Sequence, residues 1–430
     1  MKPDPRAGAV LVKRGEWVYD DTSDVARLNA LPDSIGVLAD EAAIWDARAV
    51  WLLSPHDDPA WWADPAVRFA PPPLVPGEAP TMASVKAGAR EVFVCDAARD
   101  VRWPWAQSPS PAAALATIAR IEEALDAPLT WTPATVGLRL MQATYGYRKA
   151  DSESAARTLD FRGTVAPLDL PPITPCALHW ARPVAPQEGA WWHFYDLNAA
   201  YVAAMQSTPL GALQPVKATF SPEDSVGRRA GIWQCAINGR GVNPVIRWDG
   251  WYDTAIVRAA LAADPQSVNV GGGWVWPVSP YGLRRFADRV WGARVACQEA
   301  GDTVGVQAVK AIYTQAFGSL NSARRGDAPS PYYRPHWYEA VRGESTRRTW
   351  AAVGGYDAFL ANVDMIGIAA PQADPLEARG GLVTRRATGL GGWKPALSLQ
   401  PSAALRAQAA AGALSASQLL KACREEAARG

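Results

Sequence analysis

Apolar runs alternate with amphipathic stretches over the first third of the chain. Residues 91–96 (EVFVCD) form a short apolar run that predicts a buried strand. Residues 111–127 repeat apolar side chains at three- and four-residue spacing, which predicts an amphipathic helix that begins after Ser110. Residues 132–146 indicate a second helix. Strands that alternate with helices predict a small α/β unit over residues 1–150.

The middle of the chain has a different pattern. Residues 193–197 (HFYDL) are an aromatic and apolar run that predicts a short strand, and the helix-forming AAYVAAM follows closely. Residues 247–263 change from strand to helix in a similar way. Residues 268–280 (VNVGGGWVWPVSP) predict a pair of strands with a bend at the glycines. The proline-rich residues 151–190 predict a linker and an edge ribbon.

Longer helical stretches come next. Residues 281–320 contain two of them, which predict a helical hairpin with cationic side chains on both limbs. A further helix is predicted over about residues 334–353. Residues 357–371 (DAFLANVDMIGIAAP) predict strand, Asp364 and strand, a hairpin with an acid near its tip. The tail predicts an alanine-rich helix after Pro401.

Composition limits the classes of function. With 430 residues, the chain is long enough for two or three hydrophobic cores. Hydrophobic residues at 49% and charged residues at 20% are typical of a globular protein, and a net charge of +1 excludes a globally basic nucleic-acid coat. The five scattered cysteines indicate a reducing compartment without a zinc site or a disulfide framework. No apolar run approaches the ~20 residues of a membrane helix. The N-terminus does not resemble a signal peptide, so we expect a cytoplasmic protein with no membrane contact.

One acidic residue stands where a predicted strand changes into a helix. Asp196 is the last polar position of the strand, and a carboxylate beside a helix N-terminus suits a hard cation held next to a polyphosphate. A surface aspartate that caps a helix would give the same pattern. Residues 1–150 contain no DxE motif on a strand, which a two-metal exonuclease would need. Adjacent acids there, such as Asp57-Asp58, indicate solvated loops.

Three stretches, in order along the chain, resemble motifs of family B DNA polymerases, especially the short phage-type and protein-primed members. FYDLNAAYVAAM is similar to the motif in which Asp is followed by xxSLYPS. KAIYTQAFG is similar to the fingers motif KxxxNSxYG, and FLANVDMIGI is placed like YxDTDS. The resemblance covers about residues 180–395. It implies an α/β (α+β) fold class, with an antiparallel palm sheet, a helical fingers hairpin and a small thumb-like C-terminal helix.

The resemblance implies a division of the chain into six segments. Residues 1–150 would be an N-terminal α/β region without catalytic exonuclease acids, either a degenerate exonuclease-like domain or something unrelated. The remaining segments would be a linker (151–190), a first palm segment (191–280), the fingers hairpin (281–320), a second palm segment (321–395) and a thumb-like C-terminal helix (396–430).

The resemblance also implies the residues of a site. Asp196 and Asp364 would hold two Mg²⁺ (or Mn²⁺) ions with help from the backbone carbonyl of Leu197, and Tyr201 would lie under the incoming sugar and disfavour ribonucleotides. The implied contacts to the triphosphate are Arg289, Arg294, Lys310 and Thr314. The implied contacts to nucleic acid are Arg324, Arg325, Arg347 and Arg348. The implied partners are dNTP, a primer–template and, as in protein-primed members, a priming protein.

The chain departs from the family pattern at several positions. Asn362 replaces the first Asp of DTD, where it would keep an oxygen ligand but lose a charge, and Thr314-Gln315 replace the NS of the fingers motif. These changes favour an alternative: a catalytically retired polymerase fold that binds nucleic acid or serves as a replication scaffold. A third alternative, a different α/β enzyme, finds no P-loop, nucleophile elbow or Rossmann glycine pattern in the chain. The sequence leaves open whether the template is DNA or RNA.

Overall fold

The fold is described from a computed structural model of the chain. The described residues are 10–14, 16–19, 34–44, 49–52, 58–70, 78, 80–96, 99, 102–129, 132–145, 170–185, 189–212, 214–221, 229–238, 243–325, 328–375 and 389–429. The chain forms two compact units, one of Met1–Ala143 with Asp288–Ser319, the other of Thr144–Ala287 with Leu320–Gly430. The predicted hairpin region thus falls largely in the first unit, although it lies between two stretches of the second in the sequence.

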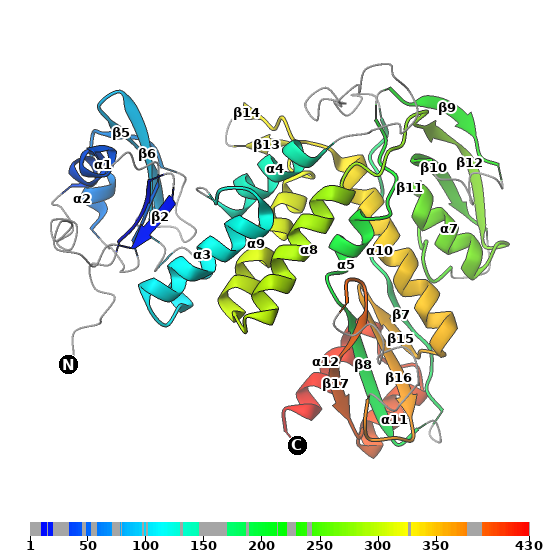
Figure 1. The fold of residues 1–430 in the computed structure, drawn as a ribbon. Helices are drawn as coiled ribbons and strands as arrows, with labels where there is room; N and C mark the ends of the chain where they lie inside the picture. The colour runs from blue at the N-terminus through cyan, green and yellow to red at the C-terminus, as the bar shows by residue number, and fades with distance from the viewer. Residues whose placement is uncertain are drawn as a thin grey trace. The chain divides into compact units, whose positions relative to one another are not determined.

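The first unit contains a six-stranded sheet (Figure 1). Its strands are β1 (Val10–Arg14), β2 (Glu16–Tyr19), β3 (Ala49–Leu52), β4 (Val67–Phe69), β5 (Met82–Ala87) and β6 (Arg90–Asp96). Their order is β2-β1-β3-β6-β5-β4, with β3 and β6 parallel and the other neighbours antiparallel. Helix α1 (Ile35–Ile44) covers β5 and β6 and shares one hydrophobic core with them. The predicted strand at residues 91–96 is confirmed. The short helices α2 (Pro59–Trp62) and η1 (Pro104–Gln107) also belong to this unit.

Helices α3 (Pro111–Leu125) and α4 (Pro133–Thr144) begin where the sequence predicts. The Oγ of Ser110 accepts a hydrogen bond from the Ala113 amide at 3.2 Å, which satisfies one of the free amides at the start of α3. The Oγ1 of Thr132 accepts from the Thr135 amide at 3.1 Å at the start of α4. In both helices a proline follows the capping residue and pre-sets the first helical φ angle.

The predicted helical hairpin over 281–320 is confirmed. It consists of α8 (Arg284–Glu299) and α9 (Thr303–Ser319), joined through Gly301, whose φ of +66° is one that glycine adopts without strain. Asp302 caps α9 by accepting from the Gly305 amide at 2.7 Å. Gly137 of α4 lies directly against Ile312 of α9, an approach that a larger side chain would prevent.

The second unit is built on a five-stranded sheet in which all neighbouring strands are antiparallel (Figure 1). Its strands are β7 (His179–Ala181), β8 (Trp191–Leu197), β15 (Leu360–Asn362), β16 (Met365–Ala370) and β17 (Trp393–Leu399). Their order is β17-β8-β16-β15-β7, so β8 is a central strand and β7 is the edge strand that the proline-rich segment predicted. Residues 151–169 and 186–188 of that segment lie outside the described residues.

Strand β8 is buried on both faces, because its side chains alternate between two hydrophobic cores. Trp192 and Phe194 pack with helices α11 (Ala403–Ala410) and α12 (Ala416–Ala427). Tyr195 and Leu197 belong to the core that also contains residues of the long helix α10 (Pro335–Tyr356). This two-residue period sets the register of the strand.

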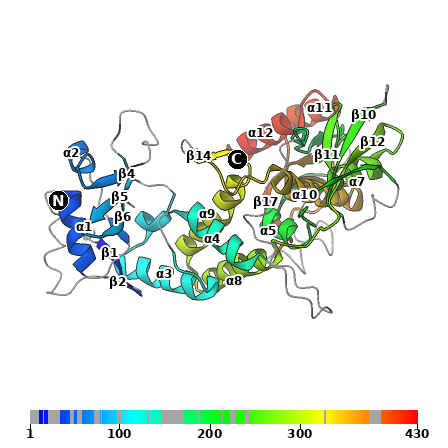
Figure 2. The same cartoon turned by 90° about the horizontal axis from the view of Figure 1, so that it is seen from above.

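A second sheet of the same unit lies beside α10 (Figures 1 and 2). It is antiparallel, in the order β11-β10-β12-β9, and consists of β9 (Val216–Thr219), β10 (Gly231–Ile237), β11 (Gly250–Asp253) and β12 (Val268–Val275). Helix α7 (Thr254–Ala263) follows β11 and packs on α10. The predicted strand pair with a glycine bend is wrong: the three glycines lie within the single strand β12, where Gly273 lets the backbone approach Ile232.

The predicted single thumb-like helix at 396–430 is also wrong. Strand β17 runs to Leu399, and two helices follow it, separated by Gly412, whose φ is +62°. They pack on the five-stranded sheet, where Leu405, Leu419 and Leu420 are buried. This tail is therefore a cover for the sheet. The remaining elements of the second unit are α5 (Ala200–Met205) and the small ribbon of β13 (Arg324–Arg325) and β14 (Ala328–Pro329).

Two glycines of α10 provide a test of this packing. A Cβ on Gly343 would collide with the carboxylate of Asp253, whereas a Cβ on Gly354 would meet nothing within 4 Å. We expect Gly343→Ala to destabilise the chain by about 1–3 kcal/mol through overpacking. Gly354→Ala should stabilise it by about 0.5–1 kcal/mol, because alanine favours the helix. Calorimetric unfolding of both variants measures the difference, and equal effects of the two substitutions would contradict the described contact.

Candidate functional site

Asp196 and Asp364 come from distant regions of the chain and lie on neighbouring strands. Asp196 is the penultimate residue of β8 and pairs with Met365, the first residue of β16. Asp364 precedes Met365 in the turn between β15 and β16, and its carbonyl accepts a hydrogen bond from the Leu197 amide at 2.9 Å. The turn is tight, since Val363 has a φ of +58°, which is strained for a β-branched residue. The structure therefore brings together the two acids that the motifs singled out.

A lysine occupies the other side of Asp196. Lys394 of β17 pairs with Asp196 across the strands, and its Nζ lies 3.0 Å from the Asp196 Oδ2. The side chain of Lys394 is 43% exposed and that of Asp196 is 27% exposed, so water screens this ion pair. Lys394 thus competes with any cation for the carboxylate of Asp196. The sequence did not predict this contact.

Tyr201 lies near Asp364, on the short helix that follows β8. Burial raises the pKa of the Tyr201 hydroxyl, and the negative charge of Asp364 adds to the increase, whereas a hydrogen bond from Arg342 acts in the opposite direction. Arg342 is held on α10 by Glu339, with nitrogen–oxygen distances of 3.1 and 3.2 Å, and by the carbonyl of Cys176 at 3.3 Å. Tyr201 is therefore close enough to Asp364 for the charge of the acid to act on its hydroxyl.

Asn362 does not supply the ligand oxygen that was expected of it from the sequence. Its Oδ1 lies 2.5 Å from the Nδ1 of His179 and 3.3 Å from the hydroxyl of Ser417. His179 belongs to the edge strand β7 and Ser417 to helix α12, and both of these elements pack on β15. The amide oxygen is thus engaged within the fold, which corrects that expectation.

The donor set around Asp196 fits a hard divalent cation with few protein ligands. No group of three or more His, Cys, Asp or Glu side chains that could hold a metal ion occurs among the described residues. Mg²⁺ in nucleotide-binding sites uses one or two carboxylates and completes its shell with water and phosphate oxygens. Two aspartates from adjoining strands, with the nearby backbone of Leu197, are groups that could supply such ligands.

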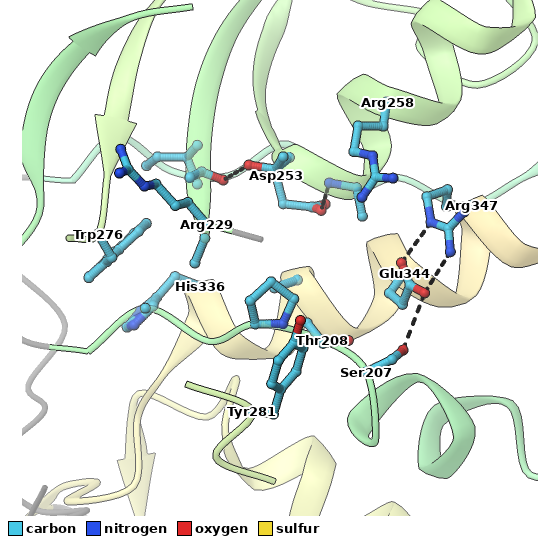
Figure 3. A pocket seen from close by; sticks show the side chains of 18 residues that line it. Ser207, Thr208, Arg229, Asp253, Arg258, Trp276, Tyr281, His336, Glu344 and Arg347 are labelled. Carbon is cyan, nitrogen blue, oxygen red and sulfur yellow. Dashed lines mark hydrogen bonds and ion pairs between the residues drawn. The ribbon is translucent and has the colours of Figure 1, made fainter. Parts of the chain in front are cut away.

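A cavity in the second unit lies between α10, the start of α7 and the loop after α5 (Figure 3). Its volume is about 280 Å³. Arg229, Arg258 and Arg347 contribute guanidinium groups to its wall, and Trp276, Tyr281 and His336 contribute rings. Figure 3 shows Arg258 and Arg347 on one side, with Arg229, Trp276 and His336 on the opposite side.

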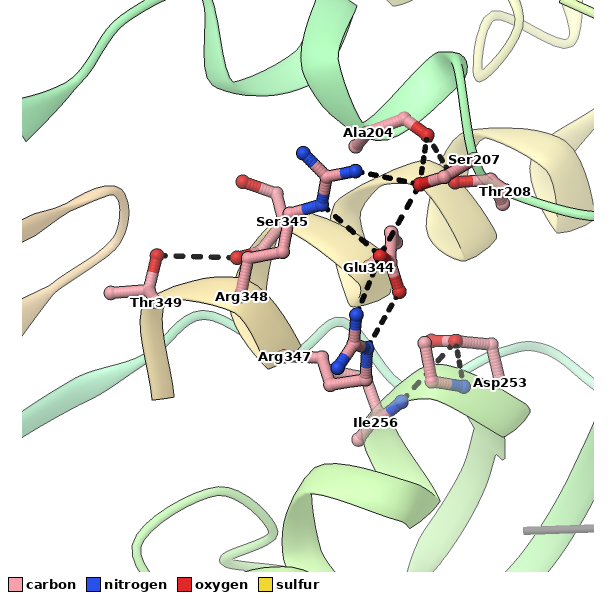
Figure 4. Close-up of polar contacts among 11 residues, drawn as sticks. Ala204, Ser207, Thr208, Asp253, Ile256, Glu344, Ser345, Arg347, Arg348 and Thr349 are labelled. Carbon is pink, nitrogen blue, oxygen red and sulfur yellow. Dashed lines mark hydrogen bonds and ion pairs between the residues drawn. The ribbon is translucent and has the colours of Figure 1, made fainter. Parts of the chain in front are cut away.

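Arg347 and Arg348 are anchored to one carboxylate (Figure 4). Arg347 donates to both oxygens of Glu344 at 2.7 and 2.8 Å, and Arg348 donates to Glu344 at 3.1 Å and to the Ser207 hydroxyl at 2.7 Å. Burial alone would raise the pKa of Glu344, but the hydrogen bonds and charges of the two arginines outweigh it and lower the pKa. The carboxylate is ionised, and it holds two of the four predicted nucleic-acid contacts, Arg347 and Arg348.

The other predicted residues have mixed outcomes. The guanidinium of Arg289 binds the end of α3, at 2.8 Å from the Leu125 carbonyl and 3.0 Å from the Asp126 carboxylate, because a helix C-terminus attracts cations. The predicted contact of Arg289 with a triphosphate stays a prediction. Arg294 donates to the Tyr313 hydroxyl at 2.8 Å. Lys310 is exposed on α9, where its carbonyl accepts from the Thr314 hydroxyl at 2.7 Å. The side chains of Arg324 and Arg325 lie outside the described residues.

The network around Arg342 was not predicted from the sequence. Tyr338, Glu339 and Arg342 lie three and four residues apart, so they share one face of α10, and the Arg342 guanidinium lies 5.5 Å from the Tyr338 ring centre. That spacing was a usable signal. Lys394 left no comparable signal in the sequence, because only the register of β17 on β8 places it opposite Asp196.

Similar solved structures are DNA polymerases. No family model and no curated protein matches the sequence. The chain is similar to Phi29 DNA polymerase in complex with primer-template DNA and incoming nucleotide, with a TM-score of 0.48, 11% identity, and coverage of 78% of this chain and 70% of that one. For the same polymerase with primer-template DNA the TM-score is 0.46 at 12% identity, with coverage of 78% and 69%. For its complex with single-stranded DNA the TM-score is 0.46 at 13% identity, with the same coverage. A likeness at this level assigns no role to any residue.

Among the described residues, no helix combines the length and the apolar character that crossing a membrane requires.

The contact between Lys394 and Asp196 leads to a prediction about cation binding. Removing the lysine charge with Lys394→Met should raise the affinity for Mn²⁺ by about twofold to fivefold, the range expected for an exposed ion pair. Isothermal titration calorimetry measures the change. Lys421→Met, which removes a lysine paired with Glu425 on α12, is the matched control and should leave the affinity unchanged. Weaker Mn²⁺ binding by Lys394→Met would show that the lysine does not compete.

Proposed function

We propose that the chain transfers nucleotidyl groups from a dNTP to a primer 3′-hydroxyl under the direction of a template. The observation that carries the proposal is the pairing of β8 with β16, which sets Asp196 beside Asp364 at one end of the sheet. Each acid lies in a stretch that resembles a metal-binding motif of family B DNA polymerases. Metal-assisted phosphoryl transfer requires two such carboxylates close together.

The chain's own residues would prepare the reactants. Asp196, Asp364 and the backbone of Leu197 would hold Mg²⁺ or Mn²⁺, and such ions activate the attacking hydroxyl and neutralise the triphosphate and the leaving group. When the cation binds, Lys394 would release the carboxylate of Asp196 and contact solvent or a substrate phosphate instead. Its Nζ lies 3.0 Å from that carboxylate, so it would need to move little. The half-buried ring of Tyr201 would limit the space for a 2′-hydroxyl.

The partners of this function would be dNTP, a primer–template nucleic acid and, as in protein-primed relatives of the resembled family, a priming protein. The roles of Arg294, Lys310 and Thr314 toward the triphosphate rest on the motif resemblance alone. Arg347 and Arg348 retain a net positive charge with Glu344 and are therefore still suited to a phosphate backbone.

A second candidate function is a retired polymerase fold that binds nucleic acid without turnover. It is favoured by two contacts: the ion pair of Lys394 with Asp196 and the engagement of the Asn362 oxygen with His179. Both use groups that an efficient metal site would keep available. The two functions differ in their need for metal, because a scaffold would bind DNA equally well with and without Mg²⁺.

Primer extension tests the proposal directly. Asp196→Asn and Asp364→Asn should each reduce dNTP incorporation on a primed template by about a thousandfold or more, since each removes a ligand charge worth several kcal/mol in the transition state. Glu425→Gln removes an exposed acid of α12 and should leave the rate unchanged. Retention of the wild-type rate by either aspartate variant would eliminate the site. An inactive wild-type chain that binds DNA without metal would favour the scaffold.

Sugar selection tests the role assigned to Tyr201. Tyr201→Ala should raise ribonucleotide incorporation relative to deoxynucleotide incorporation by about tenfold to a hundredfold, because the ring no longer excludes the additional hydroxyl. Tyr201→Phe keeps the ring and should keep the discrimination. The ratio of kcat/KM for the two nucleotide classes is measured on one template. An unchanged ratio in Tyr201→Ala would show that the ring does not select the sugar.

A further inference from the structure

The arginine-lined cavity of the second unit is a separate site from the acid pair, and its charges are unbalanced. Arg229 and Arg258 form no hydrogen bond or ion pair with any described residue. Arg229 is exposed and Arg258 is half-buried on α7. Arg347 shares the carboxylate of Glu344 with Arg348. The described residues of the wall therefore carry three guanidinium groups and only two carboxyl groups, Glu344 and Asp253, so that positive charge is in excess.

The second acid of the wall, Asp253, is deeply buried. Asp253 is 4% exposed, and burial raises its pKa well above the ordinary value, against the opposing effect of hydrogen bonds from the Ala255 and Ile256 amides. Burial therefore disfavours the charged form of this carboxyl. It also caps the start of α7, with its Oδ1 2.8 Å from the Ala255 nitrogen, and the dipole of this ten-residue helix adds partial positive charge at the cavity.

Aromatic and polar groups complete the wall. His336 stacks on Trp276, with ring centres 4.9 Å apart and planes 7° from parallel. His336 is 5% exposed, its Nδ1 has no hydrogen-bond partner among the described residues, and burial lowers its pKa to about 3, so the ring stays neutral. Tyr281 is 36% exposed at the cavity and leaves a ring edge or face accessible. Gly211 is required here, because a Cβ would collide with Trp276.

We propose that this cavity binds the phosphomonoester group of a nucleotide, either free or at the 5′ end of a nucleic-acid strand. A phosphomonoester carries a charge of about −1.5 to −2 at pH 7, which matches the excess positive charge better than a carboxylate or a phosphodiester does. Guanidinium groups bind phosphate oxygens in a two-pronged geometry, which the two arginines without a partner among the described residues, Arg229 and Arg258, are free to adopt. The accessible ring of Tyr281 suits stacking with a base.

The size of the cavity limits what can enter. A volume of about 280 Å³ is at the lower end of the range for small-ligand pockets, so it accommodates one terminal group and excludes a duplex. The proposal does not depend on nucleotidyl transfer, because none of the residues involved belongs to the acid pair.

Binding of single-stranded oligodeoxynucleotides with a 3′ fluorophore tests the proposal by fluorescence anisotropy. The affinity of the 430-residue chain for a strand with a 5′-phosphate is compared with its affinity for the same strand with a 5′-hydroxyl, in EDTA so that metal ions play no role. We expect about tenfold tighter binding of the phosphorylated strand, the gain from roughly one charge-assisted hydrogen bond. Arg229→Gln/Arg258→Gln should bind both strands with equal affinity. Arg258→Lys keeps the charge without the fork and should reduce the preference only partially.

The matched control removes the same charge elsewhere. Arg68→Gln/Arg424→Gln changes two exposed arginines outside the cavity and should keep the preference for the phosphorylated strand. Competition with inorganic phosphate and with a deoxynucleoside 5′-monophosphate distinguishes a free nucleotide from a strand end as the source of the phosphate. If the mononucleotide displaces the labelled strand, free nucleotides are the occupants. If it does not, the strand end is the occupant. Equal affinity of the unaltered chain for both strands, or a preference that survives Arg229→Gln/Arg258→Gln, would overturn the proposal. The preference for the phosphorylated strand is expected even if the chain proves inactive in primer extension.

Discussion

The pairing of β8 with β16 is the constraint on which the rest of the proposed site depends. The hydrogen bond from the Leu197 amide to the Asp364 carbonyl closes the ladder at the end where both acids lie. Slippage by one residue would turn Asp196 to the opposite face and replace it with an apolar side chain. The strand resists slippage because Trp192 and Phe194 are buried on one face and Tyr195 and Leu197 on the other. Hydrophobic burial in two cores thus holds a polar pair in place.

Helix α10 is the second organising element of that unit. It packs on α5, on α7 and on strands of both sheets, and its polar residues reach two sites. Arg342 holds Tyr201 near Asp364, and Glu344 anchors Arg347 at the arginine-lined cavity. Gly343, between them in sequence, lets the helix contact Asp253 at the start of α7. One helix therefore contributes to the surroundings of Tyr201 and to the wall of the cavity.

Local signals in the sequence were sufficient for much of the secondary structure and for the two acids. The change from strand to helix at Asp196, the acid at a hairpin tip and the serine cap of α3 are short-range features, and each is present. The tail also contains a local signal for two helices. Gly412 marks the end of the first helix, and the Ser415–Gln418 capping box marks the start of the second. Lys394 beside Asp196 and Asn362 bound to His179 depend on strand register, which no local pattern specifies.

The most direct test of the central claim is cation binding rather than turnover. Electron paramagnetic resonance counts free Mn²⁺ in solutions of the unaltered chain, of Asp196→Asn and of Asp364→Asn. If the two acids share the same ions, each substitution should weaken binding of the same Mn²⁺ by a comparable factor, and the double variant should lose little more. Binding that is unchanged in either single variant, or losses that simply add, would show that the acids act separately and would contradict the account.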